Sequence, residues 1–308
     1  MDFNKNMISK ITLGTVQLGL NYGINNSDGM PSEELSGQVL SSAIDGGITS
    51  FDTSSAYGIS EKVLGNYFKT KQNKPLIITK FSVKNYDNPL SKEEARKKII
   101  SQVENSLKDL GYNKLPLLLM HNEEDLNYYE DTVLDTLNGL KKDGLVDKVG
   151  ISLNHFSFVD KVLNNDIFEA VQVPLNMMDV KNVTSGATKK LADNNIMVFV
   201  RSVFLQGLFF KDPDTLPNGI LQNAKEPLKK IRKIAEEENM SIAGLAISYI
   251  RDLEGVTSLV MGAEKPSQVK ENIDLINVRK ITDETREKIT TAFKNVDEKV
   301  LCPWLWNK

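Results

Sequence analysis

Cysteine, histidine and tryptophan are scarce in this 308-residue chain, and long apolar runs are absent. Cys302 is the only cysteine and cannot close an internal disulfide, which fits the reducing cytoplasm. No apolar run reaches the roughly 18 residues of a membrane span. Residues 1–10 lack the apolar segment of a signal peptide. We therefore expect a cytoplasmic protein without a membrane partner.

A large excess of charge of either sign is missing as well. The formal net charge is −3 and the pI is about 5.7, so the composition does not suggest nucleic acid as a partner. An apolar fraction of 40% and a charged fraction of 26% describe a globular protein with an ample core. No metal site is predicted, and nothing in the sequence defines an oligomeric state.

Strand-like and helix-like segments alternate along the whole chain. The clearest helix is 91–111, where Ser91 and Glu94 match a capping box and Gly111 stands at the C-terminal glycine position. Eight strand–helix pairs without a break in composition predict one α/β domain over residues 1–308, a (β/α)8 TIM barrel. The predicted strands are 11–19, 49–53, 76–81, 116–121, 147–153, 168–176, 196–204 and 258–263.

A doubly wound open sheet is the alternative with the same alternation. That fold usually has a glycine-rich phosphate turn after its first strand, but neither G-x-G-x-x-G nor G-x-x-x-x-G-K-[ST] occurs here. The barrel is therefore favoured. The segment 211–227, rich in Pro, Asn, Asp and Gly, follows the seventh strand and is expected to be a lid over the active face or a disordered segment.

Three of the predicted strands end on an ionisable residue. These are Asp52, Lys80 and His121, and Tyr57 follows Asp52 by five positions. The carboxyl ends of the parallel strands of a barrel meet at one face, so these side chains are expected to converge there.

The four side chains form a set suited to reducing a carbonyl group. A tyrosine hydroxyl is a poor proton donor at neutral pH unless a nearby cation stabilises the phenolate. Lys80 can be that cation, held and kept charged by Asp52, while His121 can bind the carbonyl oxygen. Each residue alone has an ordinary structural explanation, such as a loop cap or a solvated strand end. Their joint occurrence in this order makes the catalytic interpretation the stronger one.

These residues resemble the aldo-keto reductase family. Its Asp-x-x-x-x-Tyr-Gly motif matches Asp52, Tyr57 and Gly58, and its strand-terminal Lys and His match Lys80 and His121. The resemblance spans nearly the whole chain and implies a small-molecule carbonyl substrate and a nicotinamide cofactor. It assigns proton donation to Tyr57, tuning of its acidity to Lys80 and Asp52, and orientation of the carbonyl oxygen to His121.

The second half of the chain resembles the cofactor-binding part of the family. The segments GISLNH and VQVPLN suggest Ser152 and Gln172 as contacts of the nicotinamide carboxamide. VMGAEKPSQVKEN resembles the strand and helix that bind the phosphate and adenosine groups. The further cofactor residues implied by the resemblance are Arg201, Ser202, Leu205, Gly207, Gly262, Glu264, Lys265, Gln268 and Asn272.

Three departures from the family pattern concern the cofactor. Leu153 follows Ser152, where the family has Asn. Arg201 stands where an aromatic residue commonly stacks on the nicotinamide; its charge can alter the cofactor's redox balance or meet an anionic substrate. Gln268 replaces a frequent Arg, which leaves Lys265 as the nearby cation, while Glu264 can bind a ribose 2′-hydroxyl and would favour NADH. The family habit implies NADPH, with NADH as the alternative.

We expect an NAD(P)H-dependent reductase of an aldehyde or ketone. The stretch GTVQLGLNYGI resembles bacterial reductases of carbohydrate metabolism and suggests a keto-sugar, and Trp304 and Trp306 are candidate substrate contacts, or tail-packing residues. One alternative is a nicotinamide-binding regulatory subunit with little turnover. The other is a non-redox barrel enzyme, a dehydratase or epimerase.

Overall fold

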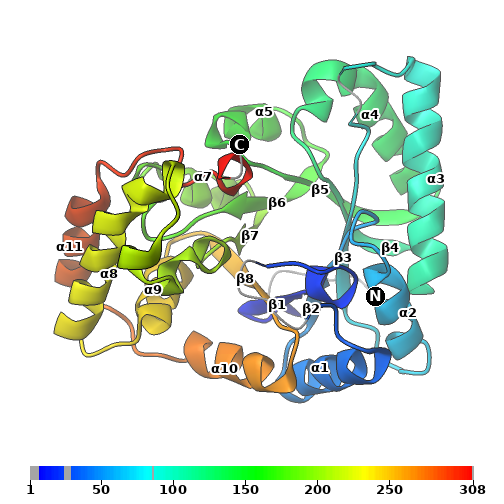
Figure 1. Cartoon of the computed structure of the whole chain (residues 1–308). Coiled ribbons are helices and arrows are strands. Elements are labelled where there is room, and N and C mark those ends of the chain that lie inside the picture. Colours follow the sequence, from blue (N-terminus) through cyan, green and yellow to red (C-terminus); the bar gives the residue numbers. More distant parts are fainter. Residues whose placement is uncertain (1–6, 24–28, 85–86, 307–308) are drawn as a thin grey trace.

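Eight parallel strands close into a barrel in the order in which they occur in the chain. The structure is a computed structural model that describes residues 7–23, 29–84 and 87–306. Helices surround the strands, as Figure 1 shows, so the prediction of a (β/α)8 barrel is confirmed. The strands are β1 (Ile11–Gly14), β2 (Ser50–Asp52), β3 (Leu76–Phe81), β4 (Leu115–Met120), β5 (Val146–Ser152), β6 (Phe168–Pro174), β7 (Met197–Arg201) and β8 (Val256–Gly262).

Each strand is followed in the chain by one or two helices. Helix α10, which follows the last strand, lies beside α1, so the ring of helices closes there (Figure 1). The helices are α1 (Glu33–Asp45), α2 (Ser60–Phe68), α3 (Lys92–Leu110), α4 (Asp125–Lys142), α5 (Val159–Leu163), α6 (Val180–Val183), α7 (Ala187–Asp193), α8 (Lys225–Glu237), α9 (Ile242–Arg251), α10 (Pro266–Ile276) and α11 (Asp283–Phe293). No helix in the described ranges is long and apolar enough to cross a membrane.

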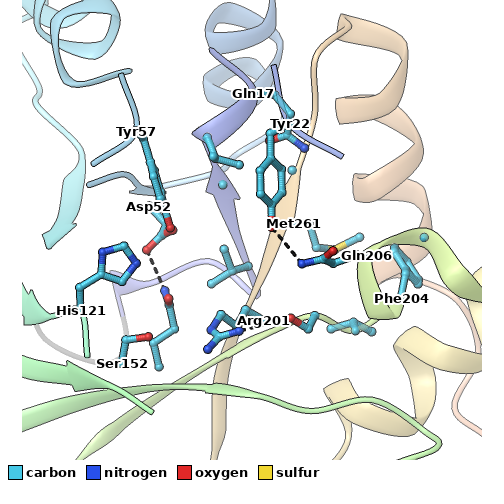
Figure 2. A pocket seen from close by; sticks show the side chains of 18 of the residues that line it. Gln17, Tyr22, Asp52, Tyr57, His121, Ser152, Arg201, Phe204, Gln206 and Met261 are labelled. Carbon is cyan, nitrogen blue, oxygen red and sulfur yellow. Dashed lines mark hydrogen bonds between the residues drawn. The ribbon is translucent and has the colours of Figure 1, made fainter. Parts of the chain in front are cut away.

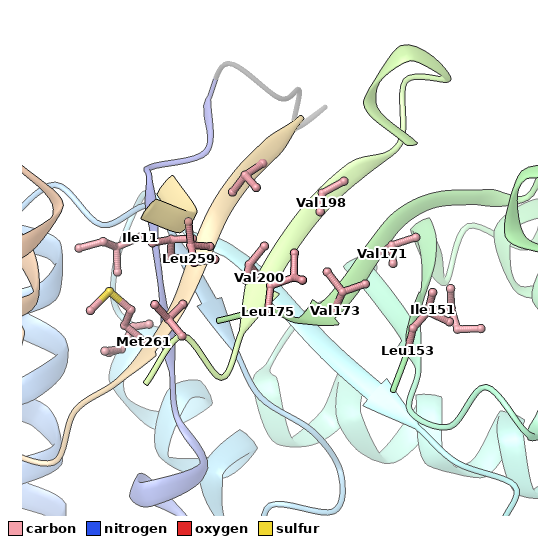
Figure 3. Packing of buried hydrophobic residues seen from close by; sticks show 14 of the residues in the cluster. Ile11, Ile151, Leu153, Val171, Val173, Leu175, Val198, Val200, Leu259 and Met261 are labelled. Atoms are coloured by element: carbon pink, nitrogen blue, oxygen red, sulfur yellow. The ribbon is translucent and has the colours of Figure 1, made fainter. Parts of the chain in front are cut away.

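The strands are apolar on both faces, and the two faces pack in different places. Alternate residues such as Val171 and Val173, or Val198 and Val200, belong to the large core between strands and helices (Figure 3). The residues between them point into the barrel, where a small cluster fills the interior. This cluster consists of Leu76, Ile78, Leu117, Leu119, Ala170, Met197 and Phe199.

A polar group completes the interior on the side of β1, β2 and β8. Thr12 Oγ1 lies 2.8 Å from both Ser50 Oγ and Ser258 Oγ, and all three residues are buried. Because these hydroxyls satisfy one another, the interior is filled on this side without an unpaired polar atom among them.

Two sequence expectations are corrected and one helix is confirmed. Helix α3 has the predicted Ser91–Glu94 capping box and ends at Gly111, whose φ is 67°. The first strand is shorter than predicted: β1 ends at Gly14, and Val16–Leu18 of the predicted strand form a 3-10 helix.

The predicted lid over 211–227 is wrong. This segment contains two short 3-10 helices, Pro213–Thr215 and Ile220–Ala224, and packs beside α8. Asn223 Nδ2 donates to Asp297 Oδ2 at 2.7 Å, which ties the segment to the chain after α11. Its prolines and apolar residues therefore serve packing at the side of the barrel.

Candidate active site

Strand parity explains why the predicted residues meet. In β3 and β4 the interior residues alternate, so Lys80 follows Leu76 and Ile78 on the inward face, and His121 follows Leu117 and Leu119. The same alternation directs an inward residue near the end of each other strand to one end of the barrel. These residues are Gly14, Asp52, Ser152, Gln172, Arg201 and Gly262, and all of them line one cavity of about 530 Å³.

Lys80 and Asp52 form a buried ion pair. Lys80 Nζ lies 2.7 Å from Asp52 Oδ1 and 2.8 Å from the Thr53 carbonyl oxygen, and neither partner is more than 4% exposed. Burial alone would lower the pKa of Lys80, but the Asp52 carboxylate and the Tyr57 phenol raise it above the ordinary lysine value. The ion pair therefore keeps the Lys80 side chain positively charged and fixed in position at the end of β3.

Tyr57 lies next to this charge, in the turn before α2. Its hydroxyl oxygen is 3.5 Å from Lys80 Nζ, which also lies 4.9 Å from the centre of the tyrosine ring. Gly58, with φ of 56°, makes the turn possible, and a side chain there would collide with the Gly19 carbonyl oxygen. This contact between two loops fixes the backbone that carries Tyr57.

His121 meets the edge of Tyr57 and is held neutral. The ring centres are 5.8 Å apart with an interplanar angle of 81°, and His121 Nδ1 lies 3.3 Å from Ser54 Oγ. Burial, assisted by the charges of Lys80, Arg201 and Lys84, lowers the pKa of His121 to about 3. A neutral imidazole can donate one N–H to a carbonyl oxygen, which is what binding of a carbonyl substrate needs.

Gln172 extends this network across the barrel. Its Nε2 donates to Asp52 Oδ1 at 2.7 Å, a bond drawn as a dashed line in Figure 2. Asp52 therefore receives hydrogen bonds from Lys80 of β3 and from Gln172 of β6. Ser152, one strand away, is 3% exposed and lines the same cavity. Gln172 thus lines the cavity, while its hydrogen bond to Asp52 was not foreseen from the sequence.

Arg201 lies between the two sides of the cavity. Figure 2 shows Tyr57, Asp52 and His121 on one side and Tyr22 and Gln206 on the other. The Arg201 guanidinium donates to the Leu153 carbonyl oxygen at 3.1 Å and to Asn154 Oδ1 at 2.7 Å. Burial lowers its pKa, against the effect of nearby phenols and carboxylates.

Glu123 was missed by the sequence reasoning and holds the loop that binds Arg201. Its carboxylate is 2% exposed and accepts the backbone N–H groups of Asn154 and His155. Burial raises the pKa of Glu123, while these hydrogen bonds and nearby cations oppose the rise. An acidic residue two positions after a strand-terminal histidine is the signal that could have revealed it.

The loop after β7 has an unusual backbone. Ser202, Leu205 and Gln206 have positive φ values of 64°, 47° and 53°, and Gly207 follows at 89°. Such conformations cost free energy in non-glycine residues and concentrate at ligand sites. Gln206 Nε2 donates to the Tyr22 hydroxyl at 3.3 Å, so the loops after β1 and β7 meet across the cavity (Figure 2).

The start of α10 carries the residues that the sequence analysis expected near the adenosine of a cofactor. Asn272 Nδ2 donates to the Gly262 carbonyl oxygen at 3.1 Å. Gln268 Oε1 accepts hydrogen bonds from the backbone N–H groups of Glu264 and Lys265 at 2.8 and 3.1 Å, so the Gln268 side chain caps the N-terminus of α10. Glu264 Oε2 is buried without a hydrogen-bond partner in the described part of the chain.

The cavity offers groups that fit a nicotinamide cofactor. Gln17 Oε1 is buried in its wall without a hydrogen-bond partner among the described residues, and can accept from a carboxamide or a hydroxyl. Lys80, Leu205, Glu264, Lys265 and Gln268 are outside its lining. The predicted residues that line it are Asp52, Tyr57, His121, Ser152, Gln172, Arg201, Ser202, Gly207, Gly262 and Asn272.

The two tail tryptophans lie apart from this cavity and differ from each other. Trp306 is half-buried against the core, and its Nε1 donates to the Val300 carbonyl oxygen at 3.1 Å. Trp304 is 45% exposed and lines a second cavity, where its ring meets the edge of His155.

The chain is similar to known proteins over nearly its whole length. The model of the aldo/keto reductase family matches residues 10–293, so the chain belongs to this family of oxidoreductases. It is 26% identical to the aldo-keto reductase YhdN of Bacillus subtilis, which covers 93% of this chain and 90% of that protein.

Two further similarities concern sequence and fold. L-glyceraldehyde 3-phosphate reductase of Escherichia coli is 22% identical, over 91% of this chain and 88% of its own. Among solved structures, the holo form of aldo-keto reductase AKR11C1 from Bacillus halodurans has a TM-score of 0.76 at 20% identity, over 96% of this chain and 95% of that chain. At this identity the structural likeness shows the fold.

Proposed function

We propose that the protein is an NAD(P)H-dependent oxidoreductase that reduces an aldehyde or ketone to the alcohol. The observation that carries this proposal is the buried Lys80–Asp52 pair beside the hydroxyl of Tyr57, with the neutral ring of His121 next to it. A proton donor and an uncharged hydrogen-bond donor line one cavity, and a fixed cation is buried next to the proton donor. Carbonyl reduction uses all three groups.

Each side chain has a role in the proposed reaction. His121 donates a hydrogen bond to the carbonyl oxygen and orients it toward Tyr57. Tyr57 gives its proton to that oxygen, and the charge of Lys80 stabilises the phenolate that remains. Asp52 keeps Lys80 charged and in place. A reduced nicotinamide, when bound, supplies the hydride.

The remaining residues would hold the cofactor. Ser152 and Gln172 suit its carboxamide, since they offer hydroxyl and amide groups at the floor of the cavity. Ser202, Leu205 and Gly207 belong to the loop with positive φ, and Gly262 and Asn272 line the far end. Arg201 presents its guanidinium to the same space.

The choice of cofactor depends on the start of α10. A 2′-phosphate on the adenosine would meet the Glu264 carboxylate, and the Gln268 amide there is already used by backbone N–H groups. A ribose 2′-hydroxyl can donate to a carboxylate oxygen such as the unpartnered Glu264 Oε2. These contacts favour NADH, whereas the cofactor that the family resemblance implies and the Lys265 cation favour NADPH.

A small polyhydroxylated compound is the proposed substrate. Relatives with this chemistry in their names include L-glyceraldehyde 3-phosphate reductase of Escherichia coli and D-threo-aldose 1-dehydrogenase of a Pseudomonas species. A structural neighbour is a glycerol dehydrogenase from Gluconobacter oxydans. These names support a polyhydroxylated compound as the class of substrate, and a keto-sugar is one member of that class.

Titration of the purified protein with NADH and with NADPH tests the proposal, with nicotinamide fluorescence as the signal. We expect micromolar binding, tighter for NADH, and oxidation of the bound cofactor when aldehydes or keto-sugars are added. Tight binding without oxidation of the cofactor would favour a regulatory subunit. Absence of binding by either cofactor would leave a non-redox enzyme as the explanation of the site.

A further inference from the structure

Arg201 brings into the active-site cavity a positive charge that no carboxylate of the described residues contacts. The hydrogen bonds of its guanidinium end on neutral oxygens. These are the Leu153 carbonyl oxygen at 3.1 Å, Asn154 Oδ1 at 2.7 Å and Ser202 Oγ at 3.5 Å. Lys80, by contrast, is paired directly with a carboxylate. The charge of Arg201 is therefore not neutralised by contact.

This charge acts on the part of the cavity where the proposed reaction takes place. Arg201 lines the same cavity as Tyr57 and His121. Burial, and after it the charges of Lys80 and Arg201, lower the pKa of His121. The ring of an oxidised nicotinamide carries a positive charge, whereas the ring of a reduced nicotinamide is neutral. A cation in this cavity therefore repels the oxidised form more than the reduced form.

The direction of the Arg201 side chain depends on its hydrogen-bond acceptors. Its backbone is fixed in the sheet, since the Leu175 N–H donates to the Arg201 carbonyl oxygen at 3.1 Å. The side chain beyond it is long and flexible, and loses much conformational freedom when it is ordered. The Leu153 and Asn154 oxygens hold the guanidinium in place.

Glu123 fixes these acceptors from the opposite side. Its two carboxylate oxygens accept the backbone N–H groups of Asn154 and His155. The peptide group between Leu153 and Asn154 is trans, so its carbonyl and its N–H point in opposite directions. The carbonyl accepts from Arg201 and the N–H donates to Glu123. One planar group thus joins the guanidinium to the carboxylate, and its rotation would break both bonds.

We propose that Glu123 is a positioning residue that holds the charge of Arg201 in the cavity, and that this charge makes the protein bind a reduced nicotinamide more tightly than an oxidised one. Glu123 is not part of the cavity lining, so it acts through Arg201. This inference rests on the proposed function and adds a preference for the direction of carbonyl reduction.

Titrations with NADH, and displacement of NADH by NAD+, test the preference; NADPH and NADP+ serve if they bind more tightly. The quantity compared is the Kd of the oxidised form divided by the Kd of the reduced form. We expect Arg201→Gln to lower this ratio about tenfold, and Glu123→Ala and Asn154→Ala to lower it about threefold. Loss of the Glu123 charge alone would raise the ratio, and a loosened loop alone would weaken both forms equally. A ratio that rises or stays constant in Glu123→Ala would overturn the proposal.

A double variant tests whether Glu123 acts through Arg201. In the Arg201→Gln background, Glu123→Ala should change the ratio by less than about twofold, because the charge to be positioned is gone. An effect as large as in the wild-type background would overturn the proposal. Glu124→Gln is the matched control, since the neighbouring carboxylate accepts from Asn127. It should leave the ratio unchanged.

NMR spectra of cofactor-free protein with labelled arginine separate the two proposals. Hydrogen bonds to two oxygens slow the rotation of the Arg201 guanidinium nitrogens, so we expect resolved signals, assigned with Arg201→Gln. These signals should merge in Glu123→Ala and stay resolved in Glu124→Gln. Resolved signals in Glu123→Ala would overturn the positioning role. Failure to bind any nicotinamide cofactor would instead contradict the proposed function, and the cofactor-free spectra would still decide the role of Glu123.

Discussion

The ends of β2 to β4 and the ends of β5 to β8 differ in how their polar groups are satisfied. In the first region, Lys80, Asp52 and Tyr57 contact one another, and two of them are almost fully buried. In the second region, Glu264 keeps a buried carboxylate oxygen without a partner in the described residues. The difference suggests that the groups for chemistry are arranged before ligands bind, whereas the groups for recognition are completed by ligands.

Tyr57→Phe should have the largest effect and confine it to chemistry. Loss of the proton donor is expected to lower kcat by about 10³-fold, within the range for general acid catalysis, and to leave cofactor affinity within about twofold. Single-turnover kinetics and fluorescence titration measure the two quantities. Tyr22→Phe is the matched control, because it removes a hydroxyl on the opposite side of the cavity that bonds Gln206. If Tyr57→Phe weakened binding and left turnover intact, the assigned mechanism would be wrong.

Asp52→Asn tests whether the first region depends on its ion pair for stability. The change leaves the Lys80 charge buried without its carboxylate and is expected to cost about 3–5 kcal/mol of unfolding free energy. Addition of Lys80→Met should recover part of this loss. Urea unfolding measures both variants. Asp160→Asn, which breaks an exposed pair with Lys190, should cost less than about 1 kcal/mol. Equal costs for the buried and exposed pairs would contradict the prediction.

The same contrast explains what the sequence could predict. Short apolar strands that end in Asp52, Lys80 and His121 have a period of two, so parity alone determines which side chains share the interior. Glycines and a capping box likewise define turns and helix ends from a few neighbouring residues, as at Gly111 and α3.

The second region depends on contacts between distant segments, which no local pattern encodes. Tyr22 meets Gln206 across 184 positions, and Glu123 bonds a backbone 31 residues away. The segment 211–227 has the composition of an exposed loop, yet a side-chain bond to Asp297 and packing beside α8 decide its place. Its interpretation as a lid failed because composition does not specify such partners.

Glu264→Ser should change cofactor preference by a smaller amount. Removal of the carboxylate removes repulsion of a 2′-phosphate and an acceptor for a 2′-hydroxyl, so the ratio of NADPH to NADH affinity should rise about tenfold, since charge pairs near a surface are worth a few kcal/mol at most. Paired titrations with the two cofactors measure it. Glu271→Gln neutralises an exposed carboxylate on the same helix and should leave the ratio unchanged. An unchanged ratio in Glu264→Ser would assign the preference to Lys265.

The pH dependence of His121 is the smallest effect and tests the arrangement of the first region directly. Its pKa is lowered by burial from 6.5 to about 3, so the folded protein binds no proton there between these values, while the unfolded chain does. The stability contributed by the neutral ring is therefore complete above pH 6.5 and decreases as the pH falls toward 3. In NMR spectra of histidine-labelled protein, the ring signal of His121 should stay constant from pH 8 to 5. The variant His155→Gln leaves His121 as the one histidine and so assigns its signal. A midpoint for His121 between pH 6 and 7 would mean that the ring is charged in part at neutral pH. The first region would then need a ligand to reach its catalytic state, as the second does.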